Sequence, residues 1–348
     1  MSYKFREFLK KVGSGSHTSK DLSREEAATA MEMVLQKEAT PDQIGAFLIA
    51  HRIKRPTAAE LAGMLDTYDR LSPQLSPIQS EYPVAVLNCP YDGRSRTAPV
   101  TPIVALMLVT VGIPVVMHGG DRMATKYGIP TSEVWQQLGL DWTNLSLSQL
   151  QTVFESTHLA FFYQPRHFPL SADLVSYRDR LGKRPPIATI ELMHSPYKGN
   201  SHLFCGFVHP PTEEFFKEAF SLRGTNLFTT VKGLEGSCDL PRERTAIIGL
   251  FDSNSGFSRL HLHPQEYGFF GHNVPLEDEA EFGETLRSLL AGTPSELLKT
   301  AIWNGGFYLW RCGICNTIEQ GIDKAKLLLA DGAVRDTLEK VKQAIANE

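Results

Sequence analysis

The fold is decided by a strand, a loop and a helix that follow one another in the stretch Val84-Ala-Val-Leu-Asn-Cys-Pro-Tyr-Asp-Gly-Arg-Ser-Arg-Thr-Ala-Pro-Val-Thr101. The apolar run Val84–Leu87 predicts a buried strand, and the apolar residues from Thr101 to Val111 predict a helix. Between them, Asp92-Gly93 is typical of a turn. A strand that leads through a short loop into a helix is the unit from which parallel sheets covered by helices are built.

Downstream of this stretch, short β-branched or aromatic runs alternate with helical patterns. The expected strands cover Pro114–Met117, Leu159–Tyr163, Leu203–Val208, Asn226–Val231 and Thr245–Phe251. A Phe-rich helix is expected at Thr212–Phe220, and the segment Glu277–Ala346 has a helical pattern. This alternation predicts an α/β domain with a mostly parallel sheet over residues 80–348.

Upstream of the stretch, the sequence predicts a small helical domain over residues 1–75. Three segments there open with a capping box, in which a Ser or Thr and a Glu or Gln three residues later bond to each other's backbone N–H groups. The boxes are Ser23 with Glu26, Thr40 with Gln43, and Thr57 with Glu60. Apolar residues follow each box at helical spacing. The segment Leu71–Pro83 holds three prolines and predicts a linker between the two domains.

Composition limits the kinds of protein that the chain can be. Its 348 residues suit two domains, and 42% apolar with 21% charged residues is typical of a folded chain. The net charge of −4 lacks the basic excess of a dedicated nucleic-acid binder. Five cysteines in a chain of this length do not indicate the disulfide framework of a small secreted domain. Because no apolar run has the length of a signal peptide or a membrane span, we expect a cytoplasmic protein without a membrane partner.

Two loops that follow predicted strands combine glycine with positive charge. The first loop holds Asp92, Gly93, Arg94 and Arg96, and the second holds His118, Gly119, Arg122 and Lys126. Glycine lets a ligand approach the backbone, and the helix that follows each loop presents N–H groups at its start. Because parallel strands end at one edge of a sheet, the two loops predict a shared site for an anionic ligand.

Several of these residues belong to a longer pattern that resembles the anthranilate phosphoribosyltransferase family. The pattern consists of Phe47–Met64, His118-Gly119 with Lys126, Val134–Gly139, Gln164–Pro169, Tyr177-Arg178 with Leu181-Gly182, and Pro264–Gly268. The resemblance covers nearly the whole chain. It implies a small N-terminal helical domain and a large α/β domain of the nucleoside phosphorylase and phosphoribosyltransferase type. It also implies a homodimer that binds phosphoribosyl pyrophosphate with Mg²⁺.

The resemblance also assigns site residues, and some of them depart from the family's pattern. The family's Gly-Thr-Gly-Gly-Asp-Gly diphosphate loop falls on Asn88–Gly93, where Pro90 has no N–H to donate. The family's metal-binding pair falls near Cys238-Asp239, which leaves Glu235 and Asp239 as the implied Mg²⁺ ligands. The implied acceptor pocket contains Arg166 and Arg178. The implied phosphoribosyl and anion site consists of Asn88, Asp92, Gly93, Arg94, Thr101, His118, Gly119 and Lys126.

Two functions are open at this point. The first is transfer of a phosphoribosyl or related pentosyl group, as the resemblance implies, with phosphoribosyl pyrophosphate or another phosphorylated small molecule as partner. The second is binding of single-stranded nucleic acid by a non-catalytic dimer, because the stretch Pro90–Gly119 is similar to the YbiB-like branch of the family. The cations that would track a phosphate backbone are Arg94, Arg96, Arg122, Lys126, Arg166, Arg178, Arg180, Lys183, Arg184 and Lys198, and the aromatic residues that would stack on bases are Tyr91, Tyr127 and Phe168.

Two further motifs have no assigned role. Cys312-Gly-Ile-Cys315 is a single CxxC pair, which supplies only two of the four ligands of a structural zinc site. His261-Leu-His263 places two imidazoles on one face of an extended strand, with His272 nearby, where they could chelate a transition metal or belong to ordinary strand sequence.

Overall fold

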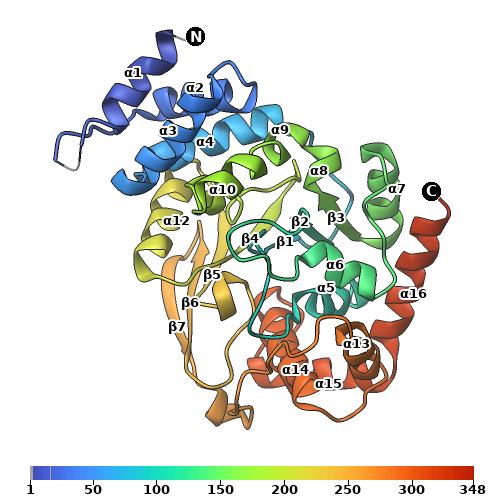
Figure 1. Cartoon of the computed structure of the whole chain (residues 1–348). Helices are drawn as coiled ribbons and strands as arrows, with labels where there is room; N and C mark the ends of the chain where they lie inside the picture. The colour runs from blue at the N-terminus through green and yellow to red at the C-terminus, as the bar shows by residue number, and fades with distance from the viewer. Residues whose placement is uncertain (1–2, 16) are drawn as a thin grey trace.

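The computed structural model describes residues 3–15 and 17–348. Four helices form a bundle at one end of the molecule, shown in blue in Figure 1. They are α1 (Tyr3–Val12), α2 (Arg24–Leu35), α3 (Pro41–Lys54) and α4 (Ala58–Leu71). The predicted capping boxes begin α2, α3 and α4, where each box has both of its bonds. Helix α2 packs against α4, and α1 packs against α3.

A seven-stranded sheet forms the centre of the rest of the chain, in the order β3-β2-β1-β4-β5-β6-β7. Its strands are β1 (Val84–Asn88), β2 (Val115–Gly119), β3 (Leu159–Tyr163), β4 (Ser201–Gly206), β5 (Leu227–Val231), β6 (Ala246–Asp252) and β7 (Gly256–Leu262). The first five strands are parallel, and β6 and β7 continue the sheet antiparallel. The prediction of an α/β domain behind a helical domain is therefore confirmed, although only the end of β7, at His261–Leu262, was indicated as extended by the sequence.

Helices of the large domain cover the sheet. They are α5 (Thr101–Thr110), α6 (Thr131–Gln137), α7 (Leu147–Thr157), α8 (Gln164–His167), α9 (Pro169–Ala172), α10 (Val175–Leu181), α11 (Ile187–Ile190), α12 (Pro210–Leu222), α13 (Phe282–Leu290), α14 (Glu296–Arg311), α15 (Ile318–Ala330) and α16 (Ala333–Ala346), with 3-10 turns at Leu234–Gly236 and Pro264–Tyr267. Helix α5 packs against β2 and β3 on one side and against α14, α15 and α16 on the other.

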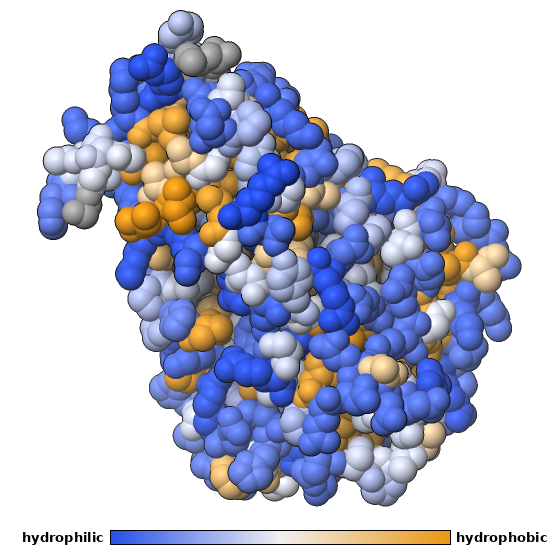
Figure 2. All heavy atoms as spheres, in the orientation of Figure 1, coloured by the Kyte–Doolittle hydropathy of each residue, from blue (hydrophilic) through white to orange (hydrophobic). Residues whose placement is uncertain are grey.

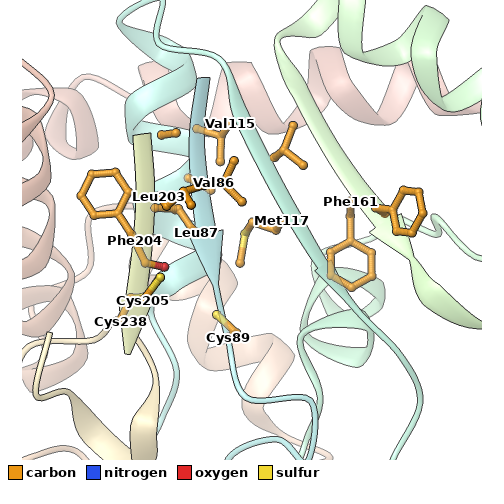
Figure 3. Packing of buried hydrophobic residues seen from close by; sticks show 14 of the residues in the cluster. Val86, Leu87, Cys89, Val115, Met117, Phe161, Leu203, Phe204, Cys205 and Cys238 are labelled. Carbon is orange, nitrogen blue, oxygen red and sulfur yellow. The ribbon is translucent and has the colours of Figure 1, made fainter. Parts of the chain in front are cut away.

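The central strands are apolar because both of their faces are covered. Every residue of β1 and β2 is buried. Figure 3 shows Val86, Leu87, Met117, Phe161 and Leu203 packed across neighbouring strands. Buried apolar surface is the main source of folding free energy, so this layer fixes the positions of the loops at the strand ends.

The helical bundle is joined to the large domain by polar contacts as well as by packing. Helix α12 packs against α4, and Arg223 at its end donates to Asp66 and to Asp69 on α4. The Tyr68 and Ser171 hydroxyls are 2.8 Å apart and buried between α4 and α9. These contacts hold α4 beside the loops described below.

No helix among residues 3–15 and 17–348 is long and apolar enough to span a membrane.

Candidate anion-binding site

The two predicted loops meet at the carboxyl edge of the sheet. Strand β1 ends at Asn88 and the parallel strand β2 ends at Gly119, so both loops leave the same edge. The loops then pair with each other, since the backbone groups of Arg94 and Ile129 exchange hydrogen bonds of 3.0 and 2.7 Å. Gly93 makes this pairing possible: its φ is +76°, and a Cβ there would lie 2.4 Å from the Gly128 carbonyl oxygen.

Arg94, predicted to bind an anion, is instead buried among the chain's own acceptors. One of its terminal nitrogens (Nη1) lies 2.5 Å from Asp239 Oδ2 and 2.8 Å from Ser237 Oγ. Its Nε lies 3.3 Å from Glu235 Oε1, and its second terminal nitrogen donates to Thr97. The side chain is 4% exposed, so these contacts take the place of a ligand from solution.

Lys126, from the second loop, reaches the same carboxylate. Its ammonium group pairs with Glu235 Oε2 and donates to the Gly93 carbonyl oxygen at 2.7 Å. Burial by itself raises the pKa of Glu235, but Lys126, Arg94 and Thr97 outweigh it and hold that pKa well below its usual range. The structure therefore brings Arg94 and Lys126 together as the sequence predicted, but around a carboxylate of the chain.

Asp239 is buried beside Arg94 and accepts hydrogen bonds from three groups. Its Oδ1 accepts the Thr101 hydroxyl at 2.7 Å, and its Oδ2 accepts the Val100 N–H at 3.2 Å as well as Arg94. Thr101, at the start of α5, thus supports a carboxylate and is buried.

The residues present do not fit Mg²⁺, which takes oxygen ligands in octahedral geometry. Both implied ligands, Glu235 and Asp239, are committed to Arg94, and Glu235 also to Lys126. A divalent cation would have to enter beside these two positive groups. Within the described residues, no group of three or more His, Cys, Asp or Glu side chains could hold a metal ion.

Little space is left in the predicted diphosphate loop. A cavity of about 10 Å³ lies there, lined by residues that include Cys89, Pro90, Gly93, Arg94 and Thr101. Such a volume holds about one water molecule, whereas pockets for ligands usually measure about 300–1,000 Å³. This cavity has no room for a sugar phosphate.

Asn88 and His118 of the predicted site form a separate buried chain of polar groups with Tyr91. The Tyr91 hydroxyl bonds to His118 Nδ1, and His118 Nε2 bonds to Asn88 Oδ1. Burial, with a contribution from His194, lowers the pKa of His118 well below its usual value. The imidazole is therefore neutral and positions Asn88 and Tyr91. Gly119 ends β2 against the Phe161 ring, which would lie 3.3 Å from an added Cβ.

The two residues implied for the acceptor pocket differ in exposure and in bonding partners. Arg178 is buried, and one of its terminal nitrogens lies 3.0 and 2.9 Å from the two oxygens of Glu191. Arg166 is exposed and donates to the Leu145 carbonyl oxygen at 2.8 Å. Asp92 is also engaged, because its buried carboxylate pairs with Arg184.

The continuous basic groove expected for nucleic acid is interrupted for the same reason. Arg94, Lys126, Arg178, Arg122 and Arg184 each pair with a carboxylate. Of the aromatic residues expected to stack on bases, Tyr91 and Phe168 are buried, and Tyr127 is 54% exposed. The sequence shows these residue types but not which of them fold inward.

The motifs without an assigned role contribute to packing. All five cysteines are free thiols, and the N–H of Cys312 caps the end of α14. Figure 3 shows Cys205 and Cys238 close together, and the Cys238 thiol donates to the Asn88 carbonyl oxygen at 3.0 Å. His263 shares a hydrogen bond of 3.0 Å with the Thr245 hydroxyl across the β6–β7 pair.

Sequence reasoning missed the group that organises the site, the N–H groups of Ser95, Arg96 and Thr97. All three donate to Glu235, at 3.2, 3.1 and 3.0 Å. The available signal was the pair of glycines, Gly233 and Gly236, that flank Leu234-Glu235 and allow an unusual backbone there.

Comparison with known proteins agrees with this architecture. The family model described as glycosyl transferase family, helical bundle domain, matches residues 6–71, and the one described as glycosyl transferase family, a/b domain, matches residues 92–335. The anthranilate phosphoribosyltransferase of Listeria monocytogenes serovar 1/2a is 26% identical over 330 residues, which cover 92% of this chain and 94% of the relative. That of Xanthomonas campestris is 22% identical over 323 residues, covering 92% of each.

Solved structures share the fold over the whole chain. The enzyme of Thermus thermophilus has a TM-score of 0.79 at 20% identity, covering 97% of this chain and 99% of its own. The enzyme of Saccharomyces cerevisiae in complex with PRPP and Mg has a TM-score of 0.85 at 16% identity, covering 100% and 99%. On the two family models and the order of its elements, the chain belongs to the glycosyl transferase family that contains the anthranilate phosphoribosyltransferases.

Proposed function

We propose that this chain is a non-catalytic member of its family and binds single-stranded nucleic acid on a basic surface beside α10. One observation carries the first half of the proposal: Arg94 and Lys126 are both bound by Glu235, in a loop whose cavity measures about 10 Å³. The YbiB-like assignment and the cytoplasmic location stay predictions from the sequence.

Phosphoribosyl transfer needs hydrogen-bond donors and cations that stabilise the departing pyrophosphate. Here the cations are neutralised within the chain, and Pro90 removes one backbone donor. Loss of one such donor typically costs about 10²–10³-fold in rate. Several losses together argue against the reaction of the relatives.

The basic surface consists of Arg52 at the end of α3 with Arg180, Lys183 and Arg184 at the end of α10. All four side chains are exposed, and Arg52 donates to the Arg184 carbonyl oxygen, so the two ends lie together. Figure 2 shows strongly hydrophilic side chains over this part of the molecule. Arg52, Arg180 and Lys183 can contact phosphates without disturbing the buried network, whereas Arg184 would exchange its pairing with Asp92 for a phosphate.

An exposed aromatic side chain favours a single strand over a duplex at this surface. Tyr127 is 54% exposed, and its hydroxyl donates to Asp179, the neighbour of Arg180. An unpaired base can stack on such a ring, whereas a base inside a duplex cannot.

The experiment is a titration with a fluorescently labelled single-stranded oligonucleotide. If the four cations of the basic surface each contact one phosphate, affinity falls about 50-fold between 50 and 200 mM salt. The double variant Arg180→Glu, Lys183→Glu should abolish binding, and the double variant Lys340→Glu, Lys342→Glu on α16 is the matched charge control. A salt-independent affinity, or equal loss in the control, would refute the proposal.

Phosphoribosyl transfer is the second candidate, favoured by relatives that match more than nine-tenths of the chain. It predicts that phosphoribosyl pyrophosphate with Mg²⁺ raises the melting temperature. We expect no shift at millimolar ligand, because the site is closed. A clear Mg²⁺-dependent shift would establish the second candidate instead.

We also propose that the chain forms a homodimer through its helical bundle. A groove of about 410 Å³ lies between the ends of α1 and α3, lined by residues that include Val12, Ala50 and Ile53, and Ile53 is 71% exposed. Figure 2 shows an apolar patch on this end of the molecule. Light scattering should give twice the chain's mass of 38.7 kDa, and Ile53→Glu should return it to the monomer value.

A further inference from the structure

The Glu235 carboxylate lies among hydrogen-bond donors of the kind that bind oxyanions. Its Oε1 accepts the N–H groups of Arg96 and Thr97 and the Thr97 hydroxyl at 2.9 Å, and its Oε2 accepts the N–H of Ser95. Three consecutive backbone N–H groups that converge on one anion form a nest, which is a common way to bind phosphate. We call residues 95–97 with Lys126 and Arg94 the nest.

Two cations complete the nest. Lys126 pairs with Glu235 Oε2, and Arg94 Nε lies 3.3 Å from Oε1. The three N–H groups, the Thr97 hydroxyl and the two cations all converge on one carboxylate, which has only two oxygens and one negative charge. A phosphate has more oxygens and carries up to two charges, so it would use the same donors at least as fully.

The carboxylate comes from a different part of the chain and at a conformational cost. Glu235 lies in the connection between β5 and β6 and has φ +56° and ψ 23°, in the left-handed region. A non-glycine residue is disfavoured there, because its Cβ comes too close to the following carbonyl oxygen. The nest's contacts with the carboxylate compensate for this cost.

The rim of the nest is open to solvent. Ser95 and Arg96 are exposed, and the Arg96 side chain is 78% exposed, while the Glu235 side chain beneath them is 3% exposed. A small anion can therefore reach these N–H groups from outside once Glu235 is absent.

We propose that Glu235 is a built-in ligand that closes an oxyanion site, and that the nest binds a phosphate group when this side chain is withdrawn. The inference rests on the part of the proposed function that describes the site as closed in the wild-type chain. It does not depend on nucleic-acid binding, because the basic surface and the nest share no residue.

The test uses inorganic phosphate and three forms of the full chain. Glu235→Gly removes the carboxylate and suits the backbone conformation, whereas Glu235→Gln keeps the shape and fills the nest. At a phosphate concentration tenfold above its Kd, the melting temperature of Glu235→Gly should rise by about 2 °C over a chloride control of equal ionic strength. Wild type and Glu235→Gln should not shift.

A further substitution checks that phosphate binds at the nest. Adding Lys126→Met to Glu235→Gly should abolish the phosphate response. If Glu235→Gly does not fold alone, phosphate should restore its tryptophan fluorescence at 50 mM or below. Absence of any response in Glu235→Gly, or a response that survives Lys126→Met, would overturn the inference. A wild-type shift with phosphoribosyl pyrophosphate and Mg²⁺ would instead contradict the closed site of the proposed function, so the two failures are distinguishable.

Discussion

Replacing Arg94 by Met should destabilise the large domain far more than removal of an ordinary surface charge. Among the described residues, the substitution leaves the buried Asp239 with the Thr101 hydroxyl and the Val100 N–H as donors, and it also removes a cation from Glu235. Breaking a buried ion pair by removing one partner costs about 3–5 kcal/mol, because the remaining charge is uncompensated. We therefore expect Arg94→Met to lose about 3–5 kcal/mol of unfolding free energy.

Arg96 provides a matched control two residues away. Its side chain is 78% exposed and lies 3.7 Å from the same carboxylate, Glu235. Exposed ion pairs contribute about 0–1 kcal/mol, so Arg96→Met should remain within about 1 kcal/mol of wild type. The two variants remove the same type of side chain from the same loop and differ in burial.

The assay is urea denaturation followed by tryptophan fluorescence. All four tryptophans, Trp135, Trp142, Trp303 and Trp310, belong to the large domain, so the signal reports the part of the chain that holds Arg94. The slope of free energy against urea should stay constant, which makes the midpoints comparable. Equal losses for Arg94→Met and Arg96→Met would show that the buried network does not stabilise the loop, and would refute the reasoning.

Three further predictions concern other buried contacts. Burial raises the pKa of Glu60, but hydrogen bonds and neighbouring positive charge outweigh it and hold the pKa at about 2, below its ordinary 4.5. The unfolding free energy that this ionised carboxylate contributes above pH 4.5 should therefore fall by about 3 kcal/mol as the pH drops to 2. Acid titration of Glu60→Gln should lack this loss. Gly321→Ala places a Cβ 2.2 Å from a carbonyl oxygen of α14 and should lower the unfolding free energy, measured in urea, by about 1–3 kcal/mol. Gly45→Ala has nothing within 4 Å of its new Cβ and should stabilise α3 by about 0.5–1 kcal/mol. A Gly321→Ala variant as stable as wild type would contradict the close helix contact. Arg178→Met should lower the unfolding free energy by about 3–5 kcal/mol, and adding Glu191→Leu should recover most of this loss. A double variant as unstable as the single one would show that packing, and not charge, dominates at this pair.

Much of the fold could be predicted from local patterns. Capping boxes and helical spacing are properties of neighbouring residues, and the structure places helix starts at Ser23, Thr40 and Thr57 accordingly. The buried parallel strands were visible as apolar runs. Most of strand β7 was not, because Gly256–Leu262 is only partly buried and its sequence, Gly-Phe-Ser-Arg-Leu-His-Leu, mixes polar with apolar residues.

The site was only partly predictable, because its partners are distant in sequence. Loop composition predicted that Arg94 and Lys126 would bind an anionic ligand, whereas in the structure both pair with carboxylates of the chain itself. Arg94, however, meets Glu235 and Asp239 across separations of 141 and 145 residues, which no local pattern reports. The same two carboxylates had been assigned to a metal, because carboxylates that face a magnesium ion and carboxylates that face a guanidinium look alike in a sequence.

The charges of this network explain why removing different members should have opposite consequences. Arg94 and Lys126 supply two positive charges, and Glu235 and Asp239 supply two negative charges, so the buried group is balanced. Neither a free phosphate nor a free metal ion has an electrostatic reason to enter it. Removing Glu235 leaves one positive charge in excess and favours an anion, whereas removing Arg94 leaves one negative charge in excess and favours a cation. Since each single change is compensated by only one kind of ion, recovery of a site for both pyrophosphate and Mg²⁺ would require changes on both sides of the network at once.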